Sequence, residues 1–546
     1  MNHDHYRLPV SQALTAAYME RKDAGVDALY RYHAGTPQDW ETRWQRLGAS
    51  GNTRAAAADV ASVLRGYNER FGASEATMRN IAALAEGAPV IVGGQQAGLW
   101  TGPLLVIHKA VSVIGAAKSA GEQLGVHVVP VFWIAGEDHD WDEANHAYVI
   151  TAEQELRKLM ATKPEGTRTS VSRTTIGAEQ WEQLASELEQ SLPHSEFKAP
   201  MMEELRQLSG ECSSLTEMFA SIMTKLFRSE GLVLLDADDP ALRKVEAPMF
   251  RRMLEQNEKL DAAYKASAAQ VKSLGYPLQA ELAEGSANLF LFQSDKQDER
   301  TLLYKKDGFF QDRKGTVTWT QDELLRLVDE RPEQFSNNVM TRPLMQDYLF
   351  PVIAAVLGPG EIAYWATTGE AFRALGMEMP ILVPRMSYTL IEGTIAKNMA
   401  KYELSFADVM ERFEEKKSAW LKGQDSLDIE SKFGEAKASF ESMYLPLLEL
   451  AGSIQAGLTK LGETNMAKIL EQIGYLESKT IDAYNKQFEA STRQLERIRL
   501  SLQPLGKPQE RVVNMAGYWN RYGDEWLKKL LEAPYSRTGE HEIVYL

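Results

Sequence analysis

With 546 residues, the chain is too long for one simple hydrophobic core, and we expect it to divide into two to four units. Its hydrophobic fraction of 44% and charged fraction of 25% are ordinary for a globular protein. The net charge of −16 argues against a general nucleic-acid binder, and the single cysteine, Cys212, excludes an internal disulfide and suits a reducing compartment. We interpret Cys212 as a packing residue. Because the polar N-terminus does not resemble a signal peptide and no run approaches the roughly 18 apolar residues of a membrane span, we expect a cytoplasmic protein without membrane or nucleic-acid partners.

In the first part of the chain, a helical sequence pattern gives way to alternating strand and helix patterns. Residues 11–85 carry Ala, Arg and Glu at helical spacing. The apolar run Pro89–Gly94 then predicts a strand, a helix is predicted to begin at Pro103, and Val128–Ile134 predicts a second strand. A strand, a crossover helix and another fully apolar strand are typical of a parallel sheet that is buried on both faces. The fold class is therefore α/β.

Later segments extend or decorate this sheet. Three short runs are predicted as further strands: Gly231–Asp236, Glu361–Trp365 and Pro380–Pro384. The apolar run Leu349–Leu357 has the length of a buried strand or of core helix turns. Residues 151–230 are predicted to be mostly helical, and Asn288–Gln311 is predicted to form a β-hairpin with its turn at Lys306–Gly308.

The sequence pattern changes again from about residue 396. Apolar residues recur there at intervals of seven, in two sets that are separated by the segment Gly462–Asn465. The first set is Phe433, Phe440, Leu447, Ile454 and Leu461. The second set is Ile481, Phe488, Leu495 and Leu502. Sustained seven-residue spacing is typical of a supercoiled helix seam. We predict an antiparallel helical hairpin that turns at Gly462, and we favour homodimerisation through this arm over its folding back onto the body.

These changes of sequence pattern divide the chain into six predicted segments. They are an N-terminal helical segment (1–85), a first part of the sheet core (86–150), connecting insertions that contribute one strand (151–340), a second part of the core (341–395), the helical hairpin or coiled-coil arm (396–505) and a C-terminal segment that packs on the core (506–546).

The first candidate for chemistry is the glycine-rich segment after the first predicted strand. Four glycines allow a tight turn that brings backbone N–H groups near an anion, and the following helix N-terminus adds a positive dipole. The segment is neither a Walker sequence nor the spaced-glycine dinucleotide fingerprint. His108 and Lys109 lie in the first turns of that helix, within reach of a phosphate. We therefore predict a cofactor-binding loop. Its residues are Gly93, Gly94, Gln95, Gln96, Gly98, Thr101, Gly102 and Lys109. The alternative is a turn whose glycines serve only the backbone conformation.

The second candidate, Glu137–His146, follows the second predicted strand. Ligands of open α/β sheets lie outside the carboxyl ends of the strands, where this segment falls. Carboxylates with imidazoles can bind a metal, hold an ammonium group or transfer protons, although the spacing matches no closed zinc site. A solvated acidic cap is the alternative. The candidate catalytic residues are His108, Asp138, His139, Asp140 and His146, and the candidate substrate contacts here are Trp133, Glu137 and Asn145.

A third candidate lies in residues 337–365. Asn338, Arg342 and Gln346 would share one face if this segment were helical, although Pro343 fits only near a helix start. The tight turn Gly358–Gly360 leads into the predicted strand that holds the remaining substrate-binding candidates, Glu361 and Trp365. The alternative is that this turn serves only the fold and contacts no substrate.

A fourth candidate ends the last predicted strand. Arg385 and Ser387 are candidate cofactor contacts, because a guanidinium at this edge suits a phosphate. A solvated arginine at a strand end is the alternative.

Taken together, these segments resemble the bacillithiol-biosynthesis cysteine-adding enzyme family, whose members are taken to be cysteine ligases. The resemblance rests on GGQQAGLWTGPLLVIHKA (93–110), PVFWIAGEDHDWDEANH (130–146), RPLMQDYLFPVIAAVLGPGEIAYWA (342–366) and PILVPRMS (380–387), and it extends over essentially the whole chain. It implies a Rossmann-type core with connecting insertions, related to class I nucleotidyltransferases, and a C-terminal antiparallel coiled-coil arm that forms a homodimer. Only His108 and the fragment Pro384–Ser387 match the His-x-Gly-His and Lys-Met-Ser-Lys-Ser motifs of those nucleotidyltransferases.

The resemblance also implies a reaction, the joining of cysteine to glucosaminyl malate by an amide bond in the last step of bacillithiol synthesis. Amide formation from a free carboxylate is uphill in water, so we expect activation by ATP with Mg²⁺, through an acyl-adenylate or an acyl phosphate. The phosphates would contact the Gly94–Gly98 backbone, His108 and Arg385. Asp138 and Asp140 would hold the cysteine ammonium, and the proton of the attacking amine would pass to His139 or His146.

Two rival functions remain at this level. One is a metal-dependent hydrolase in which the segment Glu137–His146 holds a divalent cation that activates water, although no residue is assigned as a metal ligand. The other is a non-catalytic nucleotide-binding body whose helical arm recruits a partner.

Overall fold

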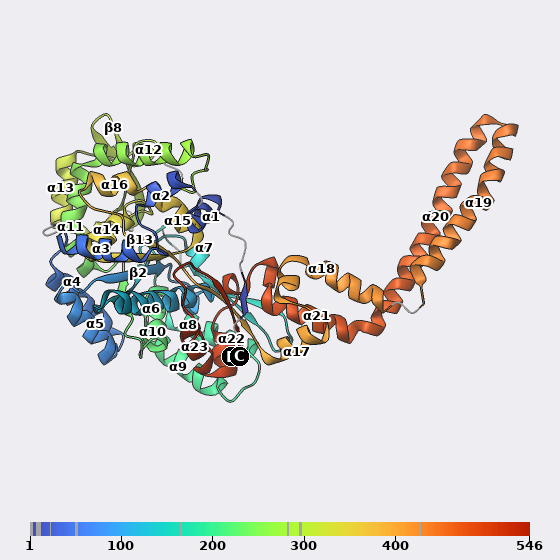
Figure 1. The fold of residues 1–546 in the computed structure, drawn as a ribbon, viewed down its shortest axis with the longest axis horizontal. Coiled ribbons are helices and arrows are strands. Elements are labelled where there is room, and N and C mark those ends of the chain that lie inside the picture. Colours follow the sequence, from blue (N-terminus) through green and yellow to red (C-terminus); the bar gives the residue numbers. More distant parts are fainter. Residues whose placement is uncertain are drawn as a thin grey trace. The chain divides into compact units, whose positions relative to one another are not determined.

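The computed structural model describes residues 4–6, 12–21, 23–49, 53–163, 166, 168–280, 283–293, 298–424 and 427–546 (Figure 1). The chain forms two compact units, one of residues 1–390 with 507–546 and one of residues 391–506. None of the described helices is both long enough and apolar enough to cross a membrane.

Five parallel strands form the central sheet of the first unit. Their order is β13-β12-β2-β3-β6, with β2 at Val90–Gln95, β3 at Val129–Ile134, β6 at Val233–Asp236, β12 at Val352–Leu357 and β13 at Ile381–Pro384. Counted along the chain, this order is 5-4-1-2-3, so the strand order reverses between β2 and β12, as in a Rossmann fold. The predicted α/β fold with a parallel sheet is confirmed, and four of the predicted strands lie where expected.

The predicted strand at Glu361–Trp365 is wrong, because this segment forms helix α15 (Pro359–Trp365). Pro359 occupies the start of the helix, and the carboxylate of Glu361 accepts a hydrogen bond from the backbone N–H of Gly358 at 2.8 Å, which caps the first turn. The apolar run that precedes it supplies the missing strand, β12.

Helices cover both faces of the sheet. One face packs, through alternate strand residues such as Val92 and Val131, against the N-terminal helices, including Leu64 and Ile81. The other face packs against α6 (Leu105–Leu124). The described N-terminal residues form the helices α1 (Ala13–Glu20), α2 (Ala24–Tyr30), α3 (Pro37–Ala49), α4 (Ala57–Arg70) and α5 (Glu75–Ala85).

The connecting insertions hold helices and two small antiparallel sheets. Between β3 and β6 the chain forms α7 (Trp141–Ala144), β4 (His146–Ile150), β5 (Leu156–Met160), α8 (Ala178–Ser191), α9 (Lys198–Gly210) and α10 (Leu215–Leu226). Between β6 and β12 it forms α11 (Pro240–Glu255), α12 (Asn257–Ser273), β7 (Ser286–Gln293), β8 (Glu299–Lys306), β9 (Phe309–Gln311), β10 (Thr318–Trp319), α13 (Gln321–Glu330), β11 (Phe335–Asn337) and α14 (Arg342–Leu349). The predicted hairpin is larger than expected, because its turn joins β8 to β9 while β7 pairs with the other edge of β8.

The last part of the first unit returns to the core. Helix α16 (Gly369–Ala374) precedes β13, and strand β14 (Ser387–Ile391) follows it. After the second unit, α22 (Ala516–Tyr522), α23 (Glu525–Leu531) and β15 (His541–Tyr545) complete the chain, and β15 lies between β14 and β1 (Asp4–Tyr6).

The second unit is helical, and it contains α17 (Gly393–Lys401), α18 (Phe406–Gly423), α19 (Ile429–Ile454), α20 (Ala456–Asn485) and α21 (Glu489–Leu502). Helices α19 and α20 lie side by side as an antiparallel pair (Figure 1). The predicted hairpin is confirmed, but its turn is at Gln455, where the backbone is extended, and not at Gly462. A Cβ on Gly462 would lie 2.3 Å from Leu448 Cδ2, so this glycine allows the two helices to pack closely.

Candidate functional site

The segments that follow β2 and β3 meet at the carboxyl edge of the sheet. Gly94 pairs with Trp133 and Gln95 with Ile134 in the parallel register, so both strands end at the same level. The side-chain amide of Gln96 donates a hydrogen bond to the carboxylate of Asp138, which joins the two predicted segments directly. The structure therefore brings the glycine-rich and acidic candidates into one neighbourhood.

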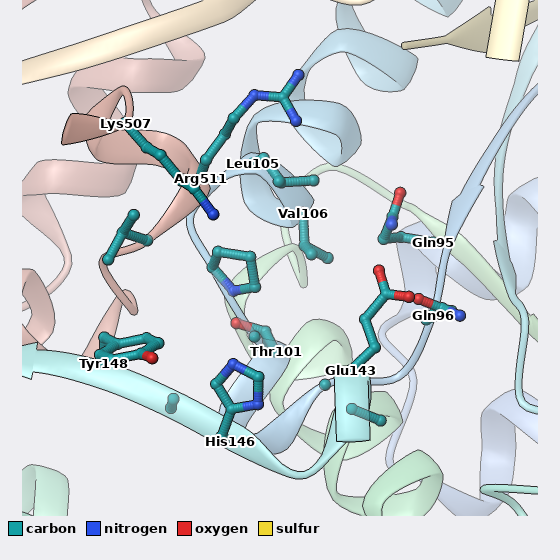
Figure 2. A pocket seen from close by; sticks show the side chains of 16 residues that line it. Gln95, Gln96, Thr101, Leu105, Val106, Glu143, His146, Tyr148, Lys507 and Arg511 are labelled. Atoms are coloured by element: carbon teal, nitrogen blue, oxygen red, sulfur yellow. The ribbon is translucent and has the colours of Figure 1, made fainter. Parts of the chain in front are cut away.

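A cavity of about 400 Å³ lies at this junction (Figure 2). Three parts of the chain line it: residues 95–106 after β2, residues 143–148 after β3, and residues 507–512 of the C-terminal segment. The backbone N–H of Asn514 donates to the carbonyl of Tyr148 at 2.8 Å, and the N–H of Leu104 donates to the carbonyl of Val513 at 2.9 Å. These bonds hold the three walls of the cavity together.

The glycines of β2 and of the loop that follows it allow close packing. A Cβ on Gly93 would lie 2.5 Å from Val113 Cγ2, and one on Gly94 would lie 2.2 Å from the carbonyl oxygen of Trp133. Gly98 is equally confined, because its Cβ would lie 2.8 Å from the Cα of Gly102. These three glycines therefore let α6, β3 and the loop itself approach the backbone, and sequence reasoning had interpreted them as a phosphate cradle.

The same loop holds two strained residues. Trp100 and Thr101 have φ angles of 46° and 74°, a left-handed conformation that side chains rarely adopt. Asn514 stabilises this turn, since its side-chain amide donates to the carbonyls of Trp100 at 2.9 Å and Gly102 at 2.6 Å. Thr101 lines the cavity, and its buried hydroxyl has no hydrogen-bond partner among the described residues.

His108 and Arg385 lie together, away from the residues that line the cavity. Both bind Glu510: His108 Nδ1 lies 2.7 Å from Glu510 Oε2, and Arg385 donates to the two carboxylate oxygens at 3.0 and 2.6 Å. Burial raises the pKa of Glu510, but the charge of Arg385 and the bond from His108 outweigh it and hold that pKa well below its usual range. Burial lowers the pKa of His108. The two predicted phosphate contacts therefore anchor the C-terminal segment through one carboxylate.

Lys109 lies at the point where the strand order reverses, and it is also paired. Its ammonium donates to the carbonyl of Gly94 at 2.7 Å, to Gln95 Oε1 at 3.2 Å and to the carboxylate of Glu361. Arg342 contacts the other carboxylate oxygen of Glu361 at 3.3 Å and the hydroxyl of Tyr364. We call the histidine and the five charged residues of these two networks the paired cluster: His108, Lys109, Arg342, Glu361, Arg385 and Glu510.

Asp138 and His139 are held by Arg300, a residue that sequence reasoning missed. Burial raises the pKa of Asp138, but the bond from Gln96 and the charge of Arg300 outweigh it and hold that pKa below its usual range. The Arg300 guanidinium lies 2.9 Å from His139 Nδ1, and burial together with this cation lowers the pKa of His139 to about 4. Since arginine only donates, His139 Nδ1 accepts and its Nε2 carries the proton. His139 is therefore poised to donate a hydrogen bond.

His146 has the opposite tautomer. Its Nδ1 lies 3.0 Å from the carbonyl oxygen of Asp142 and 3.2 Å from Asn145 Oδ1, both acceptors, so Nδ1 carries the proton and Nε2 keeps its lone pair. Burial and the charge of Lys158 lower the pKa of His146, which keeps the ring neutral near pH 7. His146 lines the cavity and lies beside Tyr148 in Figure 2. This histidine has the protonation that a general base requires.

The remaining acidic candidates divide between the cavity and the core. Asp140 caps α7 by accepting from the N–H of Glu143 at 3.3 Å, and Glu143 lines the cavity. Burial and the nearby carboxylates raise the pKa of Glu143. Glu137, in contrast, is buried and accepts from Arg243 at 2.6 Å and from the N–H of Asn337 at 3.0 Å.

The other predicted substrate contacts are mostly structural. Trp133 and Trp365 are fully buried in the hydrophobic core. Asn338 lies before α14 and binds Asn288 at 2.9 Å, so it does not share a helix face with Arg342 and Gln346 as proposed. Pro343 does occupy the first turn of α14, as expected. Asn145 supports His146, Gln346 is buried, and Ser387 binds His541 at 2.8 Å.

Sequence reasoning also missed two cations of the cavity wall, Lys507 and Arg511. The sequence signal available was the alternation of charged and proline residues in the segment Pro504–Arg511, which follows the helical arm directly. Nothing in that pattern indicates which strand ends the segment approaches.

Two further sequence interpretations concern Cys212 and metal binding. Cys212 is buried, its sulfur lies 3.4 Å from Ser221 Oγ, and burial raises the pKa of its thiol, in agreement with a packing role. The described residues contain no group of three or more His, Cys, Asp or Glu side chains placed to hold a metal ion.

Comparisons with known proteins agree with this architecture. Residues 1–386 match the model "Bacillithiol biosynthesis BshC, N-terminal Rossmann-like domain", and residues 388–546 match "Bacillithiol biosynthesis BshC, C-terminal coiled-coil domain". The chain is 35% identical over 504 residues to the "Putative cysteine ligase BshC" of Bacillus cytotoxicus, covering 92% of this chain and 93% of that one. It is 38% identical over 493 residues to the protein of the same name from Geobacillus kaustophilus, covering 89% and 90%.

Among solved structures, one titled as a putative arginyl tRNA synthetase from Campylobacter jejuni matches at 10% identity with a TM-score of 0.22. The match covers 78% of this chain and 94% of that one. This similarity is too low to support an argument. The family models span nearly the whole chain, and the relatives exceed 30% identity over most of it. The chain belongs to the bacillithiol biosynthesis BshC family.

Proposed function

We propose that this protein is the ligase that joins the carboxylate of cysteine to the amine of glucosaminyl malate in the last step of bacillithiol synthesis. The family supports a cysteine ligase, because the curated relatives carry that name. The observation that carries the site is the cavity where the β2 and β3 segments meet, with His146 at its wall and no hydrogen-bond partner for its Nε2 among the described residues. We place the reaction in the cytoplasm, where the thiol of the substrate stays reduced.

In this proposal cysteine binds where the acidic segment adjoins the cavity, beside the lining residues Gln96 and Glu143. Asp138 is held as a carboxylate, and Gln96 fixes its orientation. Asp140 and Glu143 lie on the next turn of the same segment. A carboxylate kept charged at neutral pH attracts an ammonium group, so the amino group of cysteine would lie beside Asp138. His139, whose Nε2 carries a proton, would donate to a substrate oxygen there.

His146 takes the proton of the attacking amine. Its lone pair at Nε2 is the form that accepts a proton, and its lowered pKa keeps that form populated at neutral pH. His139 does not suit this role, since Arg300 occupies its Nδ1 and its Nε2 already carries a proton. The proposal therefore selects one histidine from the two that the sequence left open.

Activation of the carboxylate by ATP with Mg²⁺ remains part of the proposal, but the predicted phosphate ligands do not fit it. His108, Lys109 and Arg385 direct their donors at Glu510 and Glu361. The Cβ positions of Gly93 and Gly94 are blocked by neighbouring atoms, which accounts for these glycines without a ligand. We therefore derive no step through the nucleotide from these residues.

The test is incubation of the purified protein with ATP, Mg²⁺, cysteine and glucosaminyl malate, followed by mass analysis of thiol and nucleotide products. We expect the cysteine amide of glucosaminyl malate, which is bacillithiol. AMP with pyrophosphate would identify an acyl-adenylate, and ADP with phosphate an acyl phosphate. Absence of the amide product with every substrate present would overturn the proposal.

We also propose that the α19–α20 hairpin forms a homodimer. Apolar side chains of this hairpin are left exposed: Leu447, Ile454 and Leu461 belong to the first predicted seven-residue set, and Met443 and Leu450 lie three residues after Phe440 and Leu447. Leu448 alone is buried in this stretch of α19, so the intramolecular pairing does not cover the seam. An uncovered seam with coiled-coil spacing is typical of a helix that pairs with a second chain.

Light scattering coupled to size-exclusion chromatography tests this dimer. The double substitution Leu447→Glu with Leu450→Glu places charges in the seam, and we expect it to halve the molar mass. The matched control is Ala438→Glu, which adds a charge to an exposed position outside the seam. An unchanged mass in the seam variant would exclude this interface.

A further inference from the structure

Lys507 and Arg511 are the cations of the cavity wall, and neither forms an ion pair or hydrogen bond with a side chain among the described residues. They flank Gln509 and Glu510, which are buried and bound on both sides. Gln509 exchanges hydrogen bonds of 2.9 and 3.0 Å with the backbone of Leu390, and Glu510 binds His108 and Arg385. The two cations are thus carried by a rigid turn that directs them to the cavity.

The wall that follows β2 also offers donors. Thr101 lines the cavity with a fully buried hydroxyl that lacks a partner among the described residues, and Gln95 and Gln96 add side-chain amides. Figure 2 shows Lys507 and Arg511 on the C-terminal segment, across the cavity from Glu143. Both cations are exposed at the cavity wall without an acidic partner among the described residues, so no ion pair in the fold accounts for them.

We infer that Lys507, Arg511 and Thr101 form a subsite for a doubly charged oxyanion group of a substrate. The inference rests on the proposed function, which offers two sources of that chemistry: the two carboxylates of the malyl group and the phosphates of ATP. Either group would supply acceptors for both cations and for the threonine hydroxyl. The subsite replaces the predicted phosphate contacts of the paired cluster, whose cations already have carboxylate partners.

Calorimetric titration of the full chain with L-malate and, separately, with inorganic pyrophosphate tests the subsite directly. We expect the wild type to bind one of these probes, with an affinity that falls as salt screens the two charges. The double variant Lys507→Gln with Arg511→Gln should weaken that binding by about tenfold or more. The matched control is Arg313→Gln with Lys314→Gln, which removes the same two charges from an exposed loop elsewhere in the unit. The probe that binds identifies the source of the oxyanion.

A second pair of variants tests the hydroxyl separately from the charge. Thr101→Val keeps the shape of the side chain and removes the hydroxyl, so we expect it to weaken the same probe, while Thr101→Ser should retain binding. Failure of both probes to bind the wild type, or wild-type affinity in the Lys507→Gln, Arg511→Gln variant, would overturn the subsite.

Steady-state kinetics separate this inference from the proposed function. With a malyl ligand, the double variant raises the KM for glucosaminyl malate and leaves that for ATP unchanged, and with a phosphate ligand the pattern reverses. Probe binding that is lost in the double variant, in a protein that forms no amide product, would support the subsite and overturn the ligase. Ligase activity with every KM unchanged in the double variant would overturn the subsite and support the ligase.

Discussion

Two groups of cations lie at the carboxyl edge of the central sheet, and they differ in their partners. In the paired cluster, Lys109 and Arg342 contact Glu361, and Arg385 contacts Glu510. In the cavity wall, Lys507 and Arg511 have no such carboxylate among the described residues, although they lie on either side of Glu510 in the chain. One buried carboxylate thus joins the two groups.

The comparison teaches that position at a strand end does not by itself make a cation a ligand contact. A buried cation needs a partner to offset the loss of hydration, and the paired cluster supplies one for each of its cations. A cation at a water-accessible wall can stay unpaired until a substrate arrives. The predictions below test this division between charges that hold the fold and charges that face the cavity.

The largest effect is expected from Glu510→Gln, which removes the charge that neutralises Arg385. Because breaking a buried ion pair leaves an uncompensated charge, we expect the free energy of unfolding to fall by about 3–5 kcal/mol. Chemical denaturation measures this loss, with Glu153→Gln at an exposed site as the control. Stability equal to that of the control variant would show that the paired cluster does not hold the fold.

The next effect concerns the cavity wall, where His146→Gln removes the proposed base. We expect the rate of amide formation to fall by about 100-fold or more, with the free energy of unfolding nearly unchanged, because the side chain is only partly buried. The counterpart His139→Gln should reduce the rate less, since that histidine donates. Equal losses in the two variants would contradict the assignment of the base.

A smaller effect is expected at Asn514, which supports the loop that carries Thr101. Asn514→Ala removes the hydrogen bonds to the carbonyls of Trp100 and Gly102, which hold the strained turn. We expect a loss of about 2 kcal/mol in the free energy of unfolding and weaker substrate binding, because Thr101 loses its support. Denaturation and KM measured on the same preparation test this coupling, and a change in only one of them would contradict it.

The smallest effect is a shift in pH dependence. His146 must be neutral to accept a proton, and burial with the charge of Lys158 lowers its pKa, so the acid limb of kcat/KM should lie below pH 6.5. Lys158→Gln removes one of these causes, which raises the pKa and moves the limb upward by less than about one pH unit. A profile that stays in place would remove His146 from the role of base.

Much of the fold follows from local pattern. The apolar runs Pro89–Gly94 and Val128–Ile134, separated by one amphipathic helix, predict a parallel pair of strands, and the structure has it as β2 and β3. The sequence was misleading where two patterns competed. Glu361–Trp365 is apolar enough for a strand, yet the proline and the capping glutamate make it a helix, and Gly462 resembles a turn but lies inside α20.

The candidate site was predicted in outline but not in its contacts. The sequence placed the two segments after neighbouring strands, and Gln96 does bind Asp138. It gave no indication that Arg300 would orient His139 or that Glu510 would bind His108 and Arg385, because these partners are 161, 402 and 125 residues away in the chain.

The sequence by itself therefore determined the α/β class, the parallel strands, the helical hairpin and the two segments that meet at one sheet edge. These features depend on hydrophobic periodicity and on strand direction, which are local properties of the chain. Only the tertiary structure decided which charges are paired, which histidine keeps a free lone pair and which cations face the cavity. Those outcomes depend on partners that are distant in the sequence. The residues that pack against a titratable side chain set its burial, its hydrogen bonds and its pKa.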